Sequence, residues 1–283
     1  MRLPLLLLAA IAALSFAGPP VGAALGLDPN AVDLLDRFAG PSPDHPLGTD
    51  ELGRDMLLRL LAGGRVSLAI GIAAALAAAA LGTLIGLVAG YRGGWTDRIL
   101  MRATDGVIAL PLLPLLIVLA ALDLGKLGVP AWIAQSDDAS LIRIVALAVL
   151  VGWTTAARLV RGATLVTRNR DFVRAARSLG AGVPHILRVH ILPNVMAPLV
   201  VATTLSVGEV ILLESVLSFL GLGIQPPLAS WGTMLSNAQQ LITSAPLLAI
   251  YPGLMIFLTV IACNLLGDAL QRRFDPREAQ RRA

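Results

Sequence analysis

The chain has 283 residues, of which 56% are hydrophobic and only 14% are charged, and its formal net charge is +4. A soluble domain carries about 25% charged residues, so this composition argues against a soluble enzyme, a disordered protein and a nucleic-acid-binding protein. The single cysteine, Cys263, excludes an intramolecular disulfide and a zinc site built from cysteines.

Apolar segments of membrane-spanning length recur along the chain. A transmembrane helix needs about 20 mostly apolar residues. The uncharged stretch 215–267 is too long for one helix, and the polar residues between Gln225 and Gln240 divide it. The predicted spans cover residues 3–27, 66–90, 106–122, 141–157, 195–221 and 245–270. The sequence therefore predicts an all-α membrane protein with six transmembrane helices.

The first apolar segment has two interpretations. Ser15-Phe16-Ala17 could be a signal-peptide cleavage site. The uncharged run continues to Leu27, however, which is longer than a usual signal core, and we favour a retained N-terminal transmembrane anchor over residues 1–27. Cleavage would leave the other five spans in the same orientation.

Residues 28–65 form the predicted extracytoplasmic loop. Gly48-Thr49-Asp50 predicts a turn, with Thr49 or Asp50 as the N-cap of a helix that starts near Leu52. We expect Arg54 and Asp55 to pair with neighbouring side chains and fix the loop. This structural role is favoured over direct contact with a substrate.

Prolines and acidic residues mark features of the later spans. Pro111 and Pro114 predict a kink, and so a possible hinge, in the third span. Asp105 is expected at the cytoplasmic start of the third span and Asp268 at the cytoplasmic end of the sixth.

Residues 171–193 predict two short helices on the inner face of the membrane. The first runs from Asp171, as the N-cap, to Gly180, as a left-handed C-cap. After a turn at 181–183, Pro184 suits the start of a second helix, which Leu192-Pro193-Asn194 ends. The loop has more apolar side chains than a solvated loop needs, which indicates either a protein partner or a helix that rests on lipid. These side chains are Phe172, Val173, Leu179, Ile186, Leu187, Val189 and Ile191.

The fifth span contains two acidic residues, Glu209 and Glu214. Five residues correspond to about 140° around a helix, so the two side chains do not share one face. A carboxylate at membrane depth suggests a functional role, here contact with the amino end of a substrate. Its alternative is a hydrogen bond to a neighbouring helix or a partner subunit, which we weigh more heavily. Gly221 and Gly223, followed by Gln225-Pro226-Pro227, predict a helix end at the outer mouth of a pathway.

The arginines set the orientation. With the N-terminus inside, the cytoplasmic segments are 1–2, 91–102, 158–194 and 271–283, and they contain 16 of the 22 basic residues. This asymmetry fits the positive-inside rule, and both termini are expected in the cytoplasm. Residues 66–270 then form the membrane core and residues 271–283 a basic tail.

Catalytic motifs are absent from the sequence. The Gly125-Lys126 pair is followed by Leu127, so no phosphate-binding loop is present. The three histidines do not form a zinc-protease motif, and no serine lies in a nucleophile elbow. The chain is therefore not expected to be an enzyme, and no cofactor or metal site is expected within it.

The 171–193 loop resembles the "EAA" loop of ABC-importer permeases. The matching residues are Ala175, Ala176, Gly180, Leu192 and Pro193, and Arg174 replaces the family's leading glutamate. The resemblance implies that this loop supplies coupling helices that dock on a cytoplasmic ATPase subunit. Arg174 reverses a charge at that surface, which suggests a compensating acid on the partner.

Further motifs resemble the C-type subunit of dipeptide, oligopeptide and nickel permeases, over about residues 45–277. They are the segment 45–55 with Gly48, Thr49, Asp50, Gly53, Arg54 and Asp55, then 64–68, 217–223, 225–227, 230–232, 267–270 and 275–277. The resemblance implies a type I importer fold with six transmembrane helices in the bacterial inner membrane. It also implies four kinds of partner: a homologous second permease, two ATPase subunits that bind ATP and Mg²⁺, an extracytoplasmic solute-binding protein and the lipid bilayer.

The sequence thus predicts half of an ABC importer's translocation pathway for di- or oligopeptides or a related small solute. An autonomous secondary transporter is the alternative, although no convincing internal repeat supports it. Which solute is carried does not follow from the sequence.

Overall fold

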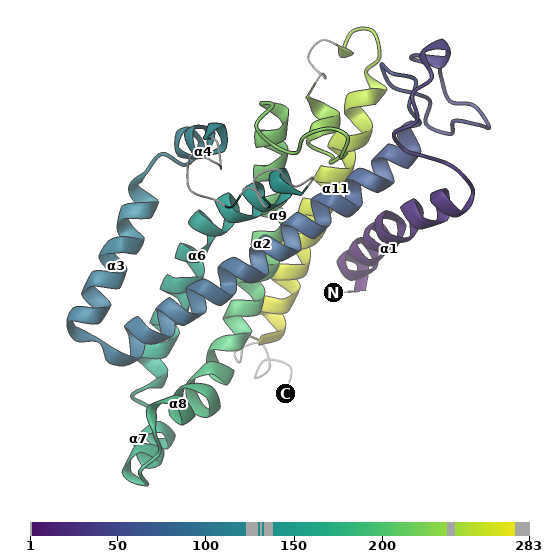
Figure 1. The fold of residues 1–283 in the computed structure, drawn as a ribbon. Helices are drawn as coiled ribbons and strands as arrows, with labels where there is room; N and C mark the ends of the chain where they lie inside the picture. The colour runs from purple at the N-terminus through teal and green to yellow at the C-terminus, as the bar shows by residue number, and fades with distance from the viewer. Residues whose placement is uncertain (1, 123–129, 131, 133–137, 237–240, 275–283) are drawn as a thin grey trace.

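The computed structural model describes residues 2–122, 130, 132, 138–236 and 241–274, and its regular elements there are helices (Figure 1). Five helices are long and apolar enough to cross a membrane, and a bent helix pair could supply a sixth crossing. The elements in chain order are α1 (Arg2–Ala24), η1 (Leu34–Asp36), α2 (Met56–Arg92), α3 (Gly94–Ala109), α4 (Leu112–Ala121), α6 (Ala139–Thr167), α7 (Asp171–Ser178), α8 (Val183–His185), η2 (Ile186–Ile191), α9 (Leu192–Phe219), η3 (Thr233–Leu235) and α11 (Leu247–Phe274). The all-α membrane fold predicted from the sequence is confirmed.

Helix α2 is the centre of the bundle, and it contacts α1, α3, α6, α9 and α11. It begins at Met56 because Asp55 is its N-cap and accepts the backbone N–H of Leu58 at 2.8 Å. The predicted helix start near Leu52, with Thr49 or Asp50 as N-cap, is therefore wrong. The first turns of α2 also belong to the segment that the sequence assigned to the loop 28–65.

The third predicted span differs from the structure. In place of one helix over 106–122, α3 begins at Gly94, directly after α2, and α4 is bent from it by 86°. The break lies at Pro111, as predicted, because a proline keeps the preceding residue, here Leu110, extended. Pro114 adds no kink, since it lies in the first turn of α4, where its missing N–H costs little.

Charged residues misled the prediction of the third span. Asp105 lies inside α3 rather than at the start of the span as predicted, and Asp97 lies in the first turn of α3. Both pair with arginines of α6. Arg161 holds Asp97 through two hydrogen bonds, the longer at 2.6 Å, and Arg158 Nη2 lies 2.6 Å from Asp105 Oδ1. These ion pairs let a charged helix pack against its neighbour.

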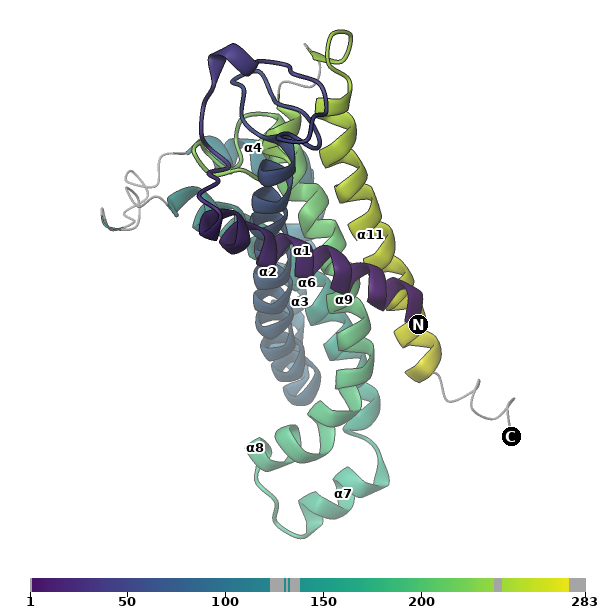
Figure 2. The same cartoon turned by 90° about the vertical axis from the view of Figure 1, so that its right-hand side faces the viewer.

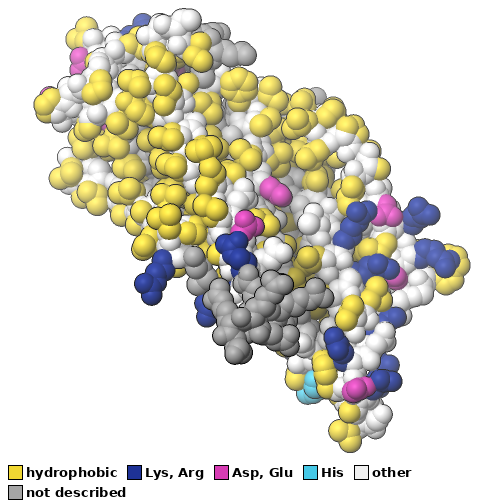
Figure 3. Space-filling model, turned by 180° about the vertical axis from the view of Figure 1, so that it is seen from behind, with side chains coloured by type: hydrophobic (Ala, Val, Ile, Leu, Met, Phe, Trp, Pro, Cys, Tyr) yellow, Lys and Arg dark blue, Asp and Glu magenta, His cyan; other side chains and the backbone are white. Residues whose placement is uncertain are grey.

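The two ends of the bundle are different (Figures 1 and 2). The 28–55 loop and the segment 220–236 lie at one end, and α7 and α8 project from the other. Helix α1 lies obliquely across the outside of the bundle and contacts α2 and α11 (Figure 2). In Figure 3, hydrophobic side chains cover most of the half away from α7, and most of the visible arginine side chains lie toward the α7 end.

Some sequence predictions concern residues outside the described ranges. These are Lys126, the polar pair Gln239-Gln240, the 275–277 motif and most of the basic tail 271–283.

Candidate functional site

The 171–193 loop begins with a short helix that ends at Gly180. Gly180 has φ +85°, its N–H donates to Arg177 O, and the N–H of Ala181 donates to Ala176 O, both at 3.0 Å. This is the Schellman arrangement, and its left-handed residue favours glycine. The predicted C-cap is confirmed. The predicted N-cap is not, because Arg170 occupies that position and Asp171 is the first helical residue.

The second part of this loop is continuous with a membrane helix. Helix α8 has Pro184 in its first turn, as predicted, and passes through the π-helical turn η2 into α9. Leu192 and Pro193 do not end the helix as the sequence suggested. The N–H of Leu192 donates to Leu187 O, five residues back, and this wider turn lets Pro193 stand in the first turn of α9.

The apolar side chains of the loop divide into two groups. Val173, Ile186 and Ile191 are buried and pack against Val160 of α6 and Val195 of α9. The second group remains exposed, and Leu179 is the most exposed of it at 89%. The exposed side chains are Phe172, Leu179, Val183 and Val189. The inward group fixes the loop to the bundle, and the outward group leaves an uncovered apolar surface of the kind that a protein partner or the lipid surface would cover.

Polar contacts join the end of α6 and the 171–193 loop to the end of α2. Arg168 Nη1 donates to the carbonyls of Gly90 and Tyr91, at 2.7 and 3.2 Å, and so satisfies free carbonyls at the end of α2. The guanidinium of Arg177 lies 5.6 Å from the ring centre of Tyr91. The loop is therefore attached to helices that cross the membrane, as a mechanical coupling element would need to be.

The motif residues of the loop lie mostly at its surface. Ala175 and Pro193 are exposed, and Ala176 and Leu192 are half-buried. Arg174 is exposed and its Nη2 lies 2.5 Å from Asp171 Oδ1 one turn earlier. The charge reversal at the position of the family's glutamate is thus partly balanced within α7 itself.

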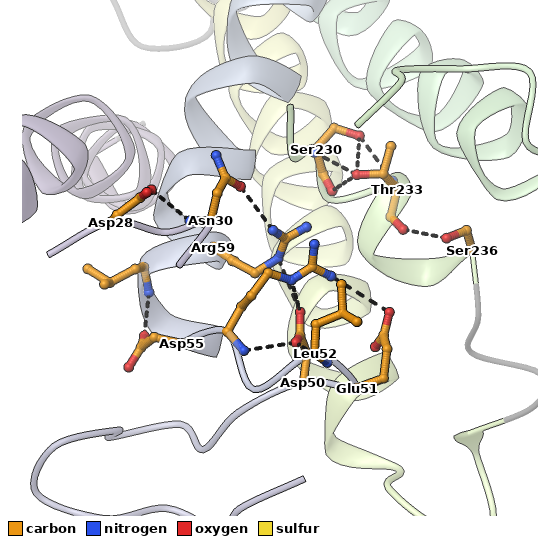
Figure 4. A network of polar contacts seen from close by, with 12 residues as sticks. Asp28, Asn30, Asp50, Glu51, Leu52, Asp55, Arg59, Ser230, Thr233 and Ser236 are labelled. Carbon is orange, nitrogen blue, oxygen red and sulfur yellow. Dashed lines mark hydrogen bonds and ion pairs between the residues drawn. The ribbon is translucent and has the colours of Figure 1, made fainter. Parts of the chain in front are cut away.

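At the other end, Asp50 organises the 28–55 loop (Figure 4). Its carboxylate accepts the backbone N–H groups of Leu52 and Arg54 and lies 2.7 Å from Arg54 Nε and 3.4 Å from Arg59 Nε. Asp55 pairs with His45 at 2.9 Å. The predicted pairing of Arg54 and Asp55 with neighbours is confirmed.

Two glycines in this loop adopt backbone conformations that other residues rarely adopt. Gly48 and Gly53 both have positive φ, +77° and +73°. A Cβ on Gly53 would lie 1.6 Å from Asp33 O, so no other residue fits there. Thr49 is buried, donates to Asp36 O and accepts the N–H of Ala39 at 2.9 Å. The signature residues therefore build a rigid loop over the start of α2.

Glu214 lies in the interior of the same end, with no exposed surface. Its carboxylate accepts three hydroxyl groups: Ser230 at 2.6 Å, Ser218 at 2.7 Å and Ser67 at 3.2 Å. Ser67 belongs to α2, and Ser230 lies in residues 220–236, which we call the mouth loop. Glu214 therefore joins three segments, as the hydrogen-bonding interpretation of the sequence anticipated.

The mouth loop starts at a second glycine cap. Gly221 has φ +76° and donates to Ser218 O, and the N–H of Leu222 donates to Leu217 O. A Cβ on Gly223 would collide with Ser218 at 1.9 Å. Trp231, completely buried, then donates from its backbone N–H to Ser67 and from Nε1 to Leu60 O. Sequence reasoning named the Ser230-Trp231-Gly232 motif but not these contacts, whose partners are far away in the chain.

Glu209 contrasts with Glu214. It is exposed on α9, and no hydrogen bond or ion pair joins it to any other described residue. The predicted difference in face between the two carboxylates is confirmed.

A row of glycines that the sequence reasoning missed packs α2 against α6. Cβ atoms on Gly82, Gly86 and Gly90 would lie 2.4, 2.6 and 2.7 Å from the nearest atoms of α6. Their spacing of four residues is the small-residue pattern of close helix packing in membranes, and it was visible in the sequence.

Comparisons with known proteins give a consistent result. Residues 82–280 match the family model described as "Binding-protein-dependent transport system inner membrane component". The chain is 44% identical over 238 residues to the glutathione transport system permease protein of Pectobacterium atrosepticum, covering 84% of this chain and 74% of that protein. It is 42% identical to the dipeptide permease protein of Bacillus subtilis, with 89% and 75% covered, and 38% identical to the oligopeptide permease protein of the same organism, with 88% and 77% covered.

One solved structure is similar in fold. It is the crystal structure of an amino acid ABC transporter with histidines, with a TM-score of 0.53 and 16% identity. The similarity covers 76% of this chain and 94% of that one.

Proposed function

This chain belongs to the family of binding-protein-dependent transport system inner membrane components, and we propose that it carries peptides through one half of the pathway of an ABC importer. As a member of this family it is a membrane permease subunit and not an enzyme. The autonomous secondary transporter that the sequence left as an alternative has no support from the family.

The observation that carries the proposal is the outward apolar group of the 171–193 loop, Phe172, Leu179, Val183 and Val189. An exposed apolar surface on an element that is fixed to two membrane helices suits the docking of another protein. We assign this surface to the cytoplasmic ATPase subunit, with Ala175, Ala176, Gly180, Leu192 and Pro193 as the coupling motif. Arg174 and Asp171 would meet the rim of that interface.

Four kinds of partner follow from this role. A second, homologous permease would complete the pathway, two ATPase subunits would bind ATP with Mg²⁺ and drive it, and an extracytoplasmic binding protein would deliver the solute. The rigid 28–55 loop, built on Gly48, Thr49, Asp50, Gly53, Arg54 and Asp55, and the mouth loop that begins at Gly221 and Gly223 would form the outer surface at which delivery takes place. The lipid bilayer is that of the bacterial inner membrane, with both termini in the cytoplasm.

The substrate class is inferred from the relatives. Their names refer to glutathione, dipeptides and oligopeptides, all of which are short peptides with a charged amino group. We infer a short peptide as the solute of this permease.

The test uses Gly180 in the assembled transporter. Gly180→Pro removes the N–H that caps α7 and demands φ near −65° where the chain has +85°. Gly182→Ala is the matched control, because Gly182 has φ −69° and an added Cβ would meet only Pro184, at 3.8 Å. Tagged protein would be purified in mild detergent and assayed for bound subunits, ATP hydrolysis and peptide uptake after reconstitution.

We expect wild type and Gly182→Ala to bring down two ATPase chains and a second permease and to take up peptide. Gly180→Pro should remain in the membrane at normal abundance but lose uptake. Normal uptake by Gly180→Pro would remove the coupling role of this loop. A wild-type chain that purifies alone and transports on an ion gradient would contradict the proposed function as a whole.

A further inference from the structure

Glu209 lies within the membrane-spanning helix α9 and has no partner in the described part of this chain. It is about 15 Å from the end of α9 at Phe219, at 1.5 Å per residue, which is half of a hydrocarbon core about 30 Å thick. A charged side chain at this depth faces protein or water rather than lipid. Unlike Glu214, Glu209 is exposed, so none of the described residues of this chain covers it.

The same face of α9 leads into a cavity. Leu205 and Ala202 lie one and two turns before Glu209 on that face. Both line a cavity of about 480 Å³ between α6, α9 and α11, toward the α7 end of the bundle. The other lining residues are mostly apolar: Leu159, Ala197, Pro198, Val201, Gln271 and Phe274. Glu209 therefore lies one helical turn beyond Leu205, at the end of the cavity away from α7, and the cavity opens on the surface of this subunit.

We propose that Glu209 is a specificity-determining residue of the pathway and binds the ammonium group of a passing peptide. This inference rests on the proposed function. A carboxylate is an acceptor with two oxygens, and hydrogen bonds between an ammonium and a carboxylate are among the stronger ones. An α-amino group, with an ordinary pKa of about 8, is mostly protonated at neutral pH. The apolar cavity below would receive the side chains of the peptide.

The alternative occupant of this face is a cation of the second permease that pairs permanently with Glu209. Water accessibility separates the two cases, since a permanent pair within an interface is closed to reagents. The chain suits the experiment, because its single native cysteine, Cys263, is buried at 3% exposure.

The experiment measures the reaction of Glu209→Cys with a cationic, membrane-impermeant methanethiosulfonate reagent in the complete reconstituted transporter. Phe257→Cys on α11 is the depth-matched control. A Cβ on Gly208 would lie 3.6 Å from Val260 Cα, so Phe257, one turn from Val260, is near the depth of Glu209. Phe257 is 56% exposed on a stripe with Leu254 and Ile261 that contains no charge and suits lipid.

We expect Glu209→Cys to react in at least one nucleotide state, and a dipeptide with the binding protein to slow the reaction at least threefold. Phe257→Cys should not react. Three results would overturn the inference. Glu209→Cys could stay unreactive with and without ATP, it could react no faster than Phe257→Cys, or peptide could fail to protect it.

Uptake gives an independent measurement. Glu209→Gln should lower dipeptide uptake by about tenfold, which corresponds to about 1.4 kcal/mol, and Glu209→Asp should restore much of it. ATP hydrolysis stimulated by the binding protein should persist in both variants. Unchanged uptake by Glu209→Gln would contradict only the role of Glu209. A wild-type complex without ATPase subunits or uptake would instead contradict the proposed function itself.

Discussion

Glu214 shows how a single side chain can hold one end of this permease together. A carboxylate without solvent contact is costly unless hydrogen bonds replace its lost water. Here three serine hydroxyls do so. Each serine oxygen in turn accepts a backbone N–H group, from Trp231 for Ser67, from Ile224 for Ser218 and from Thr233 for Ser230. These hydrogen bonds join the mouth loop to α2 and α9 and so fix its position on the bundle.

Removing this carboxylate should destabilise the folded protein. Glu214→Ala leaves three buried hydroxyls without their acceptor and a cavity beside Gly232, and unsatisfied buried groups cost about 1–3 kcal/mol each. Glu214→Gln keeps one acceptor oxygen and should lose less. The measurement is the thermal unfolding midpoint of the purified complex in detergent.

Glu209→Ala is the control, on the same helix and also a loss of a carboxylate. Glu209 is exposed and has no partner among the described residues. The unfolding midpoint of the Glu209→Ala variant should therefore match that of the wild type. Equal midpoints for Glu214→Ala and Glu209→Ala would show that the serine network contributes nothing to stability.

At the scale of elements, the close contact of α2 and α6 determines the framework. Without a hydrophobic driving force between helices in lipid, small residues that let backbones approach become decisive. The glycine row brings α2 against α6 near Trp153, Ala157 and Arg161. Since α6 leads into α7, this contact also determines the position of the 171–193 loop.

Gly86→Ala should disturb that contact. Its Cβ would lie 2.6 Å from the carbonyl oxygen of Ala157, a backbone atom that cannot move aside alone. Overpacking of this kind costs typically about 1–3 kcal/mol, so the variant should unfold at a lower temperature and accumulate less in the membrane. Gly162→Ala on α6 provides the comparison, because an added Cβ there meets nothing within 4 Å. If both variants keep the wild-type midpoint, the two helices do not depend on close packing.

How far the sequence could predict these elements depends on where the partners lie. The apolar runs identified the helices α1, α2, α6, α9 and α11, because a long apolar segment without charges is enough to predict a membrane-spanning helix. Helix α3 was misplaced because its charges are neutralised by Arg158 and Arg161, more than fifty residues away. The different faces of Glu209 and Glu214 followed from the helical period, but which of them is buried depends on Ser67 and Ser230, which the sequence does not bring together.

At the scale of the whole molecule, the two ends have different chemistry. One end carries the 28–55 loop, which an ion pair of Asp50 with Arg54 and a hydrogen bond between Asp55 and His45 stabilise, and beside it the mouth loop. The other carries the arginine-rich 171–193 loop with its exposed apolar group. Basic segments stay on the cytoplasmic side, so the end with α7 should face the ATPase and the opposite end the binding protein.

This orientation can be measured with cysteines at the two ends. Asp44→Cys lies in the 28–55 loop and Asn169→Cys between α6 and α7, and both positions are exposed. In right-side-out membrane vesicles, an impermeant maleimide should label Asp44→Cys at once and Asn169→Cys only after the membrane is made permeable. Arg2→Cys should behave like Asn169→Cys if the first helix is retained with its N-terminus inside. The wild-type chain, whose only thiol is the buried Cys263, sets the background. Labelling of Asn169→Cys in sealed vesicles would place the 171–193 loop on the outer side, where no ATPase could bind it, and would contradict both the topology and the coupling role argued from it.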